Sequence, residues 1–247
     1  MTWKTHILGG MQAGILMIAL SDATGQTAIM EMGAAAVGSL MLDIDHPQSK
    51  ISRIDLPVKL LISDNITKVT KHRREVHTVW CSFFISLIVL ILMELLKILQ
   101  IPDSAIGIGV LAFVLFDIVF KIPIGSVAFV ICIILAPVIN VSGPISIPSM
   151  PNSNKDILLI TAAMFAGCIS HLLYDTFNPQ GIMWLHPIKK KRYSLANIDT
   201  SSAAELSFRV FMIVITIAML VVINPFSNIS FEISPITIPD LSGHGFH

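Results

Sequence analysis

The sequence predicts an all-α membrane protein, a polytopic helical bundle of about six to seven helices. Two observations lead to this fold class. Hydrophobic residues make up 54% of the chain and charged residues only 13%, whereas an ordinary soluble domain has about 25% charged residues. In addition, many apolar runs approach the roughly 20 residues that a helix needs to cross a bilayer. No long polar linker divides the chain, so we expect one integral membrane domain over 1–247, with a bundle over 1–223 and a C-terminal tail over 224–247.

The two apolar segments nearest the N-terminus, 7–20 and 27–42, are short and rich in Gly and Ala. Small residues let helices approach closely in lipid, so both segments are expected inside the bundle. Their length leaves open whether they cross the membrane completely. Gly9, Gly10 and Gln12 interrupt the first segment, which favours a packed helix over the smooth apolar core of a signal peptide.

Five longer apolar segments are each expected to cross the membrane once: 79–98, 104–120, 122–141, 157–174 and 206–223. Polar stretches connect these segments. Residues 43–78 are expected to form a loop at the membrane face, with a short amphipathic helix near 60–69. Prolines make 142–156 an irregular connector, and 176–204 carries a basic cluster at 189–192.

The basic residues predict an orientation. If the first two segments form an out-and-back pair and each later segment crosses once, all of the 16 Lys and Arg residues except Lys97 and Lys155 fall on one face. Cytoplasmic loops of membrane proteins are enriched in Lys and Arg. The basic face is therefore expected to be cytoplasmic, and the C-terminal tail to lie outside.

Three short segments that reach this face hold most of the notable His and Asp residues. The first is Leu42-Asp43-Ile44-Asp45-His46-Pro47. Carboxylate and imidazole groups at such close spacing suit zinc, manganese or magnesium. In the alternative, Asp43 and Asp45 are solvated or cap a helix end, and spacing alone favours this alternative.

The second segment, His72-Arg73-Arg74-Glu75-Val76-His77-Thr78, directly precedes the apolar run 79–98. Arg73 and Arg74 suit the binding of a phosphate or a carboxylate. Basic residues before a membrane helix also anchor it on the cytoplasmic side. Taken alone, the segment favours the anchoring role.

The third segment, His171-Leu172-Leu173-Tyr174-Asp175, ends an apolar run. A spacing of four places His171 and Asp175 on one helix face, where both can reach one metal ion or Asp175 can orient the imidazole. Ionisable groups in a membrane helix are costly and usually functional, so we favour a functional role here. His6, at the start of the first apolar segment, would by itself be an ordinary interfacial residue.

Together these segments resemble the YdjM family of bacterial inner-membrane proteins, which are described as membrane-bound metal-dependent hydrolases. The matching stretches are Thr5-His6, 42–49, 72–78 and 167–181, and they occur in the family's order. The resemblance implies a multi-pass protein of the cell inner membrane. The family in turn is similar, remotely, to zinc-dependent phospholipase C and the single-strand-specific nucleases, which cleave phosphate esters with metal ions.

By position, the resemblance implies that a set of His and Asp side chains binds a divalent metal, with zinc favoured: His6, Asp43 or Asp45, His77, His171 and Asp175. His46, in the first segment, is a further candidate ligand. The chemistry implied is metal-assisted hydrolysis. Arg73 or Arg74 would hold a substrate phosphate, and the aspartate of the Asp43/Asp45 pair that does not bind metal, assigned to Asp45, would orient the water.

The predicted function is therefore a membrane-bound metal-dependent hydrolase acting on an ester or phosphoester, such as a lipid head group. Two alternatives stay open: a non-catalytic scaffold or regulator with a structural metal site, and a transporter whose His and Asp residues line a polar path. A transporter would need ionisable residues at the middle of the bilayer, whereas most of those here lie at helix ends. The expected partners are the lipid bilayer and a lipid or phosphoester substrate, with no nucleic acid. The sequence leaves the oligomeric state open.

Overall fold

The structure is a computed structural model that describes residues 1–23, 25–45, 76–98 and 153–224. Its regular elements are all helices: α1 (Trp3–Ser21), α2 (Gly25–Met41), the short 3-10 helix η1 (Leu42–Asp45), α6 (Val79–Ile98), α9 (Asn154–Asp175) and α10 (Ala203–Ile223). The only β pairing among the described residues is an isolated bridge between Ile182 and Tyr193. The all-α prediction is confirmed for this part of the chain. The predicted helices at 60–69, 104–120 and 122–141 lie outside the described residues.

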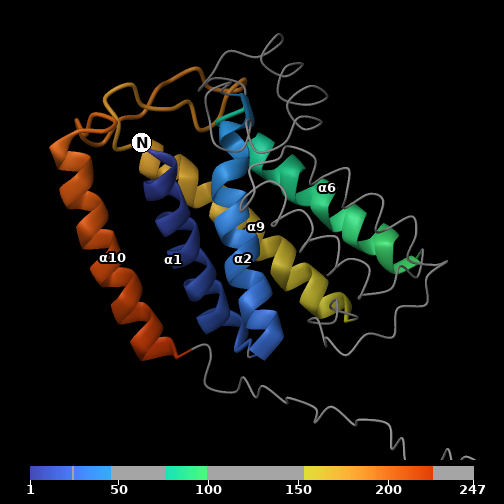
Figure 1. Ribbon diagram of the computed structural model, residues 1–247. Helices are drawn as coiled ribbons and strands as arrows, with labels where there is room; N and C mark the ends of the chain where they lie inside the picture. Colours follow the sequence, from blue (N-terminus) through green and yellow to red (C-terminus); the bar gives the residue numbers. More distant parts are fainter. Residues whose placement is uncertain (24, 46–75, 99–152, 225–247) are drawn as a thin grey trace, which may run out of the picture.

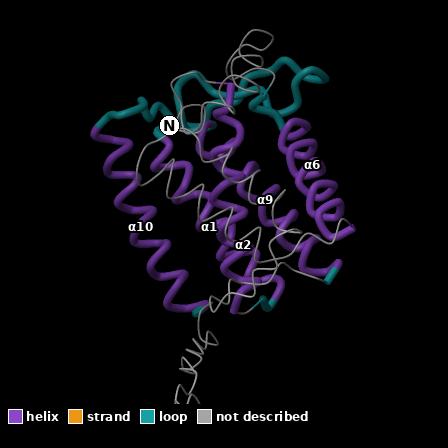
Figure 2. The backbone as a smooth tube through the Cα atoms, turned by 45° about the vertical axis from the view of Figure 1, so that its right-hand side comes forward, coloured by secondary structure: helices purple, strands orange, loops and turns teal. Residues whose placement is uncertain are grey.

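The five α-helices form a bundle in which successive described helices run in opposite directions (Figure 1). Helices α1 and α9 lie at the centre of the described bundle: α9 contacts α1, α2 and α6, and α1 contacts α2, α9 and α10. The starts of α1, α6 and α10 and the ends of α2 and α9 therefore lie at one end of the bundle, which is also where the long loop 176–202 runs (Figure 2). We call this the upper end. At the opposite end, Lys97 of α6 donates a hydrogen bond to Asn154 of α9.

Within the part of the chain that the structure describes, α6, α9 and α10 are long and apolar enough to cross a membrane. Only 11% of the most apolar 18-residue stretch is buried in α6 and in α10, against 56% in α9. The outer helices thus expose apolar faces that suit a lipid surrounding, whereas α9 is largely covered by its neighbours. Helices α1 and α2, with 19 and 17 residues, are shorter than α9 and less apolar than the outer helices.

The helix bounds follow from the apolar runs together with local capping. The predicted segment 79–98 coincides with α6, but α9 and α10 each begin three residues before the predicted 157 and 206. In both helices a serine, Ser153 or Ser202, accepts a hydrogen bond from an amide of the first turn. Such caps satisfy amides that have no partner within the helix, so the helix starts at the cap and not at the first apolar residue.

Glycines bring α2 and α9 into backbone contact. A Cβ atom on Gly167 would lie 2.0 Å from the carbonyl oxygen of Ala35, and one on Gly38 would lie 2.3 Å from that of Met164. Only glycine allows backbones to approach so closely. The prediction that the small-residue segments pack inside the bundle is confirmed for α2. The contact also sets the end of α2 beside the end of α9, where His171 and Asp175 lie.

Replacing Gly167 by alanine is expected to destabilise the bundle, because the added methyl group would overlap the backbone of α2. Overpacking of a tight contact typically costs about 1–3 kcal/mol. Gly33 is the matched control, since it is exposed on α2 and a Cβ atom there meets nothing within 4 Å. Gly33→Ala should leave stability unchanged or slightly higher. Denaturation of both variants in detergent tests this, and equal stability would contradict the close α2–α9 contact.

Candidate metal centre

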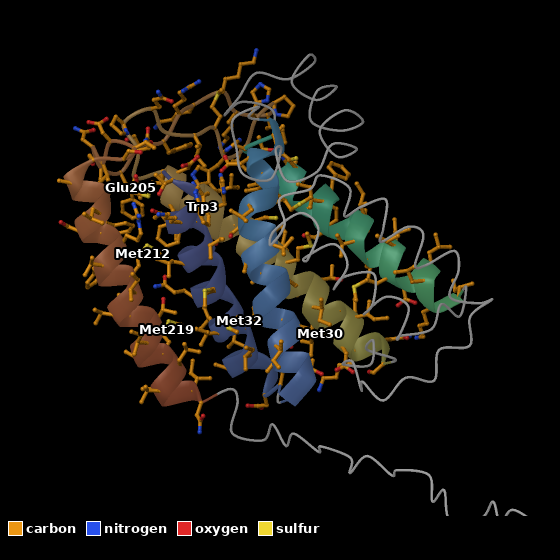
Figure 3. All side chains as sticks on the ribbon, in the orientation of Figure 1. Trp3, Met30, Met32, Glu205, Met212 and Met219 are labelled. Atoms are coloured by element: carbon orange, nitrogen blue, oxygen red, sulfur yellow. The ribbon has the colours of Figure 1, made fainter. Side chains whose placement is uncertain are left out.

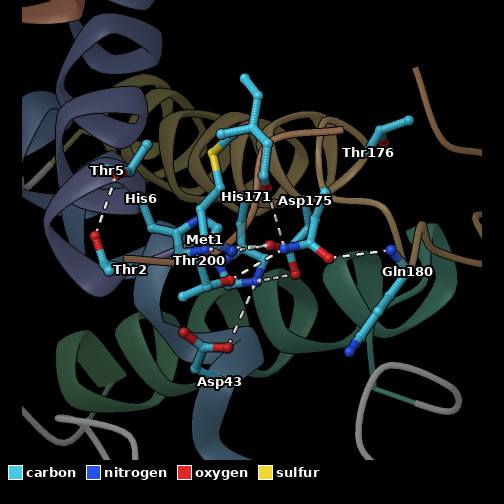
Figure 4. Close-up of polar contacts among 12 residues, drawn as sticks. Met1, Thr2, Thr5, His6, Asp43, His171, Asp175, Thr176, Gln180 and Thr200 are labelled. Atoms are coloured by element: carbon cyan, nitrogen blue, oxygen red, sulfur yellow. Dashed lines mark hydrogen bonds and ion pairs between the residues drawn. The ribbon is translucent and has the colours of Figure 1, made fainter. Parts of the chain in front are cut away.

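Five of the predicted ligand residues meet at the upper end of the bundle. His6 lies near the start of α1, Asp43 in η1, His77 directly before α6, and His171 and Asp175 near the end of α9. Figure 4 shows His6, Asp43, His171 and Asp175 close together. The side chains of the three histidines and Asp175 are 0–1% exposed, and that of Asp43 is 18% exposed. The structure thus forms one buried cluster from residues distant in sequence, and their role as metal ligands stays a prediction.

The other predicted site residues cannot be placed in this cluster. His46, Arg73 and Arg74 lie outside the described residues. Asp45 is the last residue of η1, and its side chain is also outside the described part.

The orientation of His171 is fixed by a backbone group. Its Nδ1 lies 2.6 Å from the carbonyl oxygen of Ser39. A carbonyl only accepts, so Nδ1 carries a proton, and in the neutral ring Nε2 presents a lone pair. This Nε2 is buried and makes no hydrogen bond among the described residues. A hydrogen bond from the second ring nitrogen is typical of metal-binding histidines, because it fixes the tautomer and aims the ligand atom.

Two carboxylates face the lone pair of His171. Nε2 lies 3.7 Å from Asp43 Oδ1 and 3.6 Å from Asp175 Oδ2. With a neutral ring these groups are all acceptors, and a positive charge between them would offset the cost of bringing them together. A shared proton would give N–O distances of about 2.7–3.2 Å. The observed separations are wider than that.

The spacing fits a metal ion better than a proton. His77 Nε2 lies 3.5 Å from Asp43 Oδ1 and 3.7 Å from Asp175 Oδ2, in the same range as the distances from His171. Two ligands of a tetrahedral zinc ion with bonds of about 2.0–2.2 Å are separated by roughly 3.3–3.6 Å.

Two overlapping triads have the composition of a metal site: His6, His171 and Asp175, and Asp43, His77 and His171. Within each triad the ligand atoms lie within 4.8 Å of one another. His171 belongs to both triads, and His6 stacks on its ring with centroids 3.8 Å apart. The donor set and its spacing therefore fit a divalent metal such as zinc.

Asp43 is the most open member of the cluster, and it is ionised. Burial raises the pKa of its carboxyl group, but the neighbouring His171, His77 and His6 lower it by more than burial raises it. The pKa of Asp43 therefore lies well below its ordinary value. Its partial exposure marks the side from which solvent reaches the cluster.

Sequence reasoning missed two groups at the cluster. Ser39 contributes a backbone carbonyl, for which the sequence carries no signal because any residue has one. The amino group of Met1 donates a 2.8 Å hydrogen bond to Asp175 Oδ1. This contact adds a positive charge beside one carboxylate of the cluster.

Comparison with known proteins assigns the family. A model of the YdjM inner membrane protein family matches residues 1–232, so the chain belongs to this family, as its motifs predicted. The uncharacterized protein YvsG of Bacillus subtilis (strain 168) is 32% identical over 111 residues, which are 45% of this chain and 60% of YvsG. The chain thus matches less than two thirds of that relative's length. No solved structure matches the chain.

Removing the imidazole that both triads share is expected to abolish or strongly weaken metal binding. His171→Ala leaves each triad with two ligands, whereas His186→Ala changes a histidine of the loop outside the cluster and serves as the control. Metal content of the purified proteins after zinc loading measures the effect. Wild-type metal content in His171→Ala would contradict a centre built on this residue.

Proposed function

We propose that this YdjM-family protein is a membrane-bound metal-dependent hydrolase that cleaves an ester or phosphoester of a membrane-associated substrate. One observation carries the proposal: the buried lone pair of His171 faces the carboxylates of Asp43 and Asp175 at 3.6–3.7 Å. A cation bound between these acceptors would offset their negative charge, and the His and Asp composition suits zinc. The partial exposure of Asp43 supports a reactive site over a sealed one.

The residues of the cluster would divide the work. His6, His77, His171, Asp43 and Asp175 would hold the ion, and an ion bound there would supply Lewis-acid chemistry for hydrolysis. The Ser39 carbonyl keeps the lone pair of His171 aimed at the common space. Substrate would approach beside Asp43, which borders the open side. Arg73 or Arg74 would hold the phosphate and Asp45 would orient the attacking water, as proposed from the sequence.

The position of the cluster supports a membrane substrate. It lies where apolar helices begin and end, which in a bilayer is near the level of the head groups. At the same end the loop exposes a basic run: Lys189, Lys190, Lys191 and Arg192. An excess of basic residues favours the cytoplasmic side. We therefore propose a multi-pass topology with the cluster at the cytoplasmic face of the inner membrane.

A structural metal site in a scaffold or regulator is the second candidate. It is favoured by one observation, namely that four of the five side chains are 0–1% exposed, and structural zinc sites are closed by protein ligands. A transporter is supported less, because the cluster lies at helix ends and not along a path through the bilayer. Activity measurements separate the first two candidates.

Two substitutions should separate the metal ligand from the substrate-binding group. Asp43→Asn is expected to lower zinc content and hydrolysis together, because a carboxylate ligand becomes an amide. Arg73→Ala should keep the zinc but lower the rate about 10-fold or more for a phosphate-bearing lipid, because the residue acts on the anion. The assay is zinc content together with release of phosphate or phosphorylated head group from phospholipid vesicles. Lys191→Ala, an exposed basic residue of the loop, is the control. Retention of zinc without hydrolysis by the wild-type protein would favour the scaffold.

The proposed orientation predicts which added cysteines react from outside the cell. Ser194 is exposed in the loop at the upper end, whereas Ser242 belongs to the C-terminal tail. In a background without reactive native thiols, an impermeant maleimide should label Ser242→Cys and spare Ser194→Cys in intact cells. Permeabilised cells, where both should react, provide the control. The opposite labelling pattern would show that the orientation is inverted.

A further inference from the structure

Glu205 is a buried carboxylate that lies beside the start of α1 (Figure 3). Its Oε1 accepts hydrogen bonds from the amide of Thr2 at 2.6 Å, the hydroxyl of Thr2 at 2.8 Å and the hydroxyl of Thr5 at 2.7 Å. Its Oε2 accepts one from the amide of Ser201 at 2.6 Å. The side chain is 0% exposed, and these donors compensate for the loss of hydration.

The pattern Ser202-Ala203-Ala204-Glu205 is that of a capping box, in which the glutamate would bond to the amide of the capping serine. Here the carboxylate accepts instead from Ser201 and from α1. The cap of α1, Thr2, makes no side-chain capping bond of its own. One carboxylate thus serves the N-termini of two helices that are about 200 residues apart, where the helix dipoles favour a negative charge.

His6, the residue after Thr5, has no backbone group holding its Nδ1 among the described residues. Its Nδ1 is buried and makes no hydrogen bond within the described residues, in contrast to His171, whose Nδ1 is held by Ser39. The ring of His6 stacks on His171, and its Nε2 lies 3.4 Å from Asp175 Oδ1. Where the ring lies therefore depends on where the first turn of α1 lies.

We propose that Glu205 is a positioning residue that holds His6 in the metal centre by fastening the first turn of α1. The inference rests on the proposed metal-binding function. Glu205 does not touch the cluster, and it acts through Thr2 and Thr5 on the backbone that carries His6. Further along the contact between the two helices, Gln12 donates hydrogen bonds to the carbonyl oxygen of Met212 at 3.0 Å and to the hydroxyl of Thr216 at 3.1 Å.

Zinc affinity of the full-length protein in detergent tests the proposal. Glu205→Ala should weaken zinc binding by about 10- to 100-fold, the effect typical of losing support for a metal ligand. Glu205→Gln keeps one acceptor oxygen for the threonine hydroxyls, so its zinc affinity should lie between that of the wild type and that of Glu205→Ala. If the alanine variant does not fold, the glutamine variant provides the test. In a His6→Ala background, Glu205→Ala should weaken zinc binding no further, because the residue that it positions is gone. A further loss in that background, or wild-type affinity in both Glu205 variants, would overturn the proposal.

A second measurement does not depend on the metal. In the metal-free protein, diethyl pyrocarbonate should modify His6 slowly, since it is 1% exposed, and much faster in Glu205→Ala. His171 should stay as protected as in the wild type. Thr216→Val is the control: it removes a polar contact of the same helix pair and should lower the melting temperature without exposing His6 or changing zinc affinity. If His6 became as reactive in Thr216→Val as in Glu205→Ala, any loss of contact between α1 and α10 would expose it. That result would overturn the proposal. If Glu205→Ala exposes His6 while the wild-type protein binds no zinc, the positioning role stands and the proposed metal function fails.

Discussion

The arrangement at the upper end of the bundle depends on one electrostatic constraint: the buried lone pair of His171 Nε2 faces two carboxylates. With a neutral ring, these three acceptors point at a common space, and a positive charge among them would offset the cost of bringing them together. The amino group of Met1 balances part of the charge of Asp175, but Asp43 and the lone pair still face the common space. The convergence of α1, η1, α6 and α9 at this point is the basis of the proposed cation site.

The close packing of the helices makes that geometry possible. Zinc ligands must approach one another within roughly 3.3–3.6 Å, which leaves little tolerance for the helices that carry them. Gly38 and Gly167 bring α2 and α9 into backbone contact one to two turns below the cluster. That contact sets Ser39 against His171, and with it the tautomer and aim of the ring. The small residues inside the bundle thus determine how far apart the polar residues at its upper end lie.

The sequence predicted the single helices well and the contacts between them only in part. An apolar run that starts directly after a polar segment gave the bounds of α6, and the spacing of four between His171 and Asp175 predicted their shared face. Spacing alone could not have joined His6 to His171 or Asp43 to His77, because no local rule relates residues so far apart; the predicted topology and the family resemblance did. Ser39 acts through a backbone carbonyl, which the sequence does not reveal. Glu205 lay just outside the predicted apolar run, and a capping role would have accounted for it without α1.

The uneven exposure of the cluster bears on whether the site is reactive or structural. A structural zinc ion is fully enclosed by protein ligands, whereas a catalytic one keeps a position open for water or substrate. In the triad of His6, His171 and Asp175 every side chain is 1% exposed or less. The triad of Asp43, His77 and His171 differs, because Asp43 is 18% exposed. Since His171 belongs to both triads, an ion on the Asp43 side would be held from below by buried histidines and remain accessible from above. One closed and one open flank around a shared imidazole would suit the proposed site, which has to hold an ion and also admit a substrate.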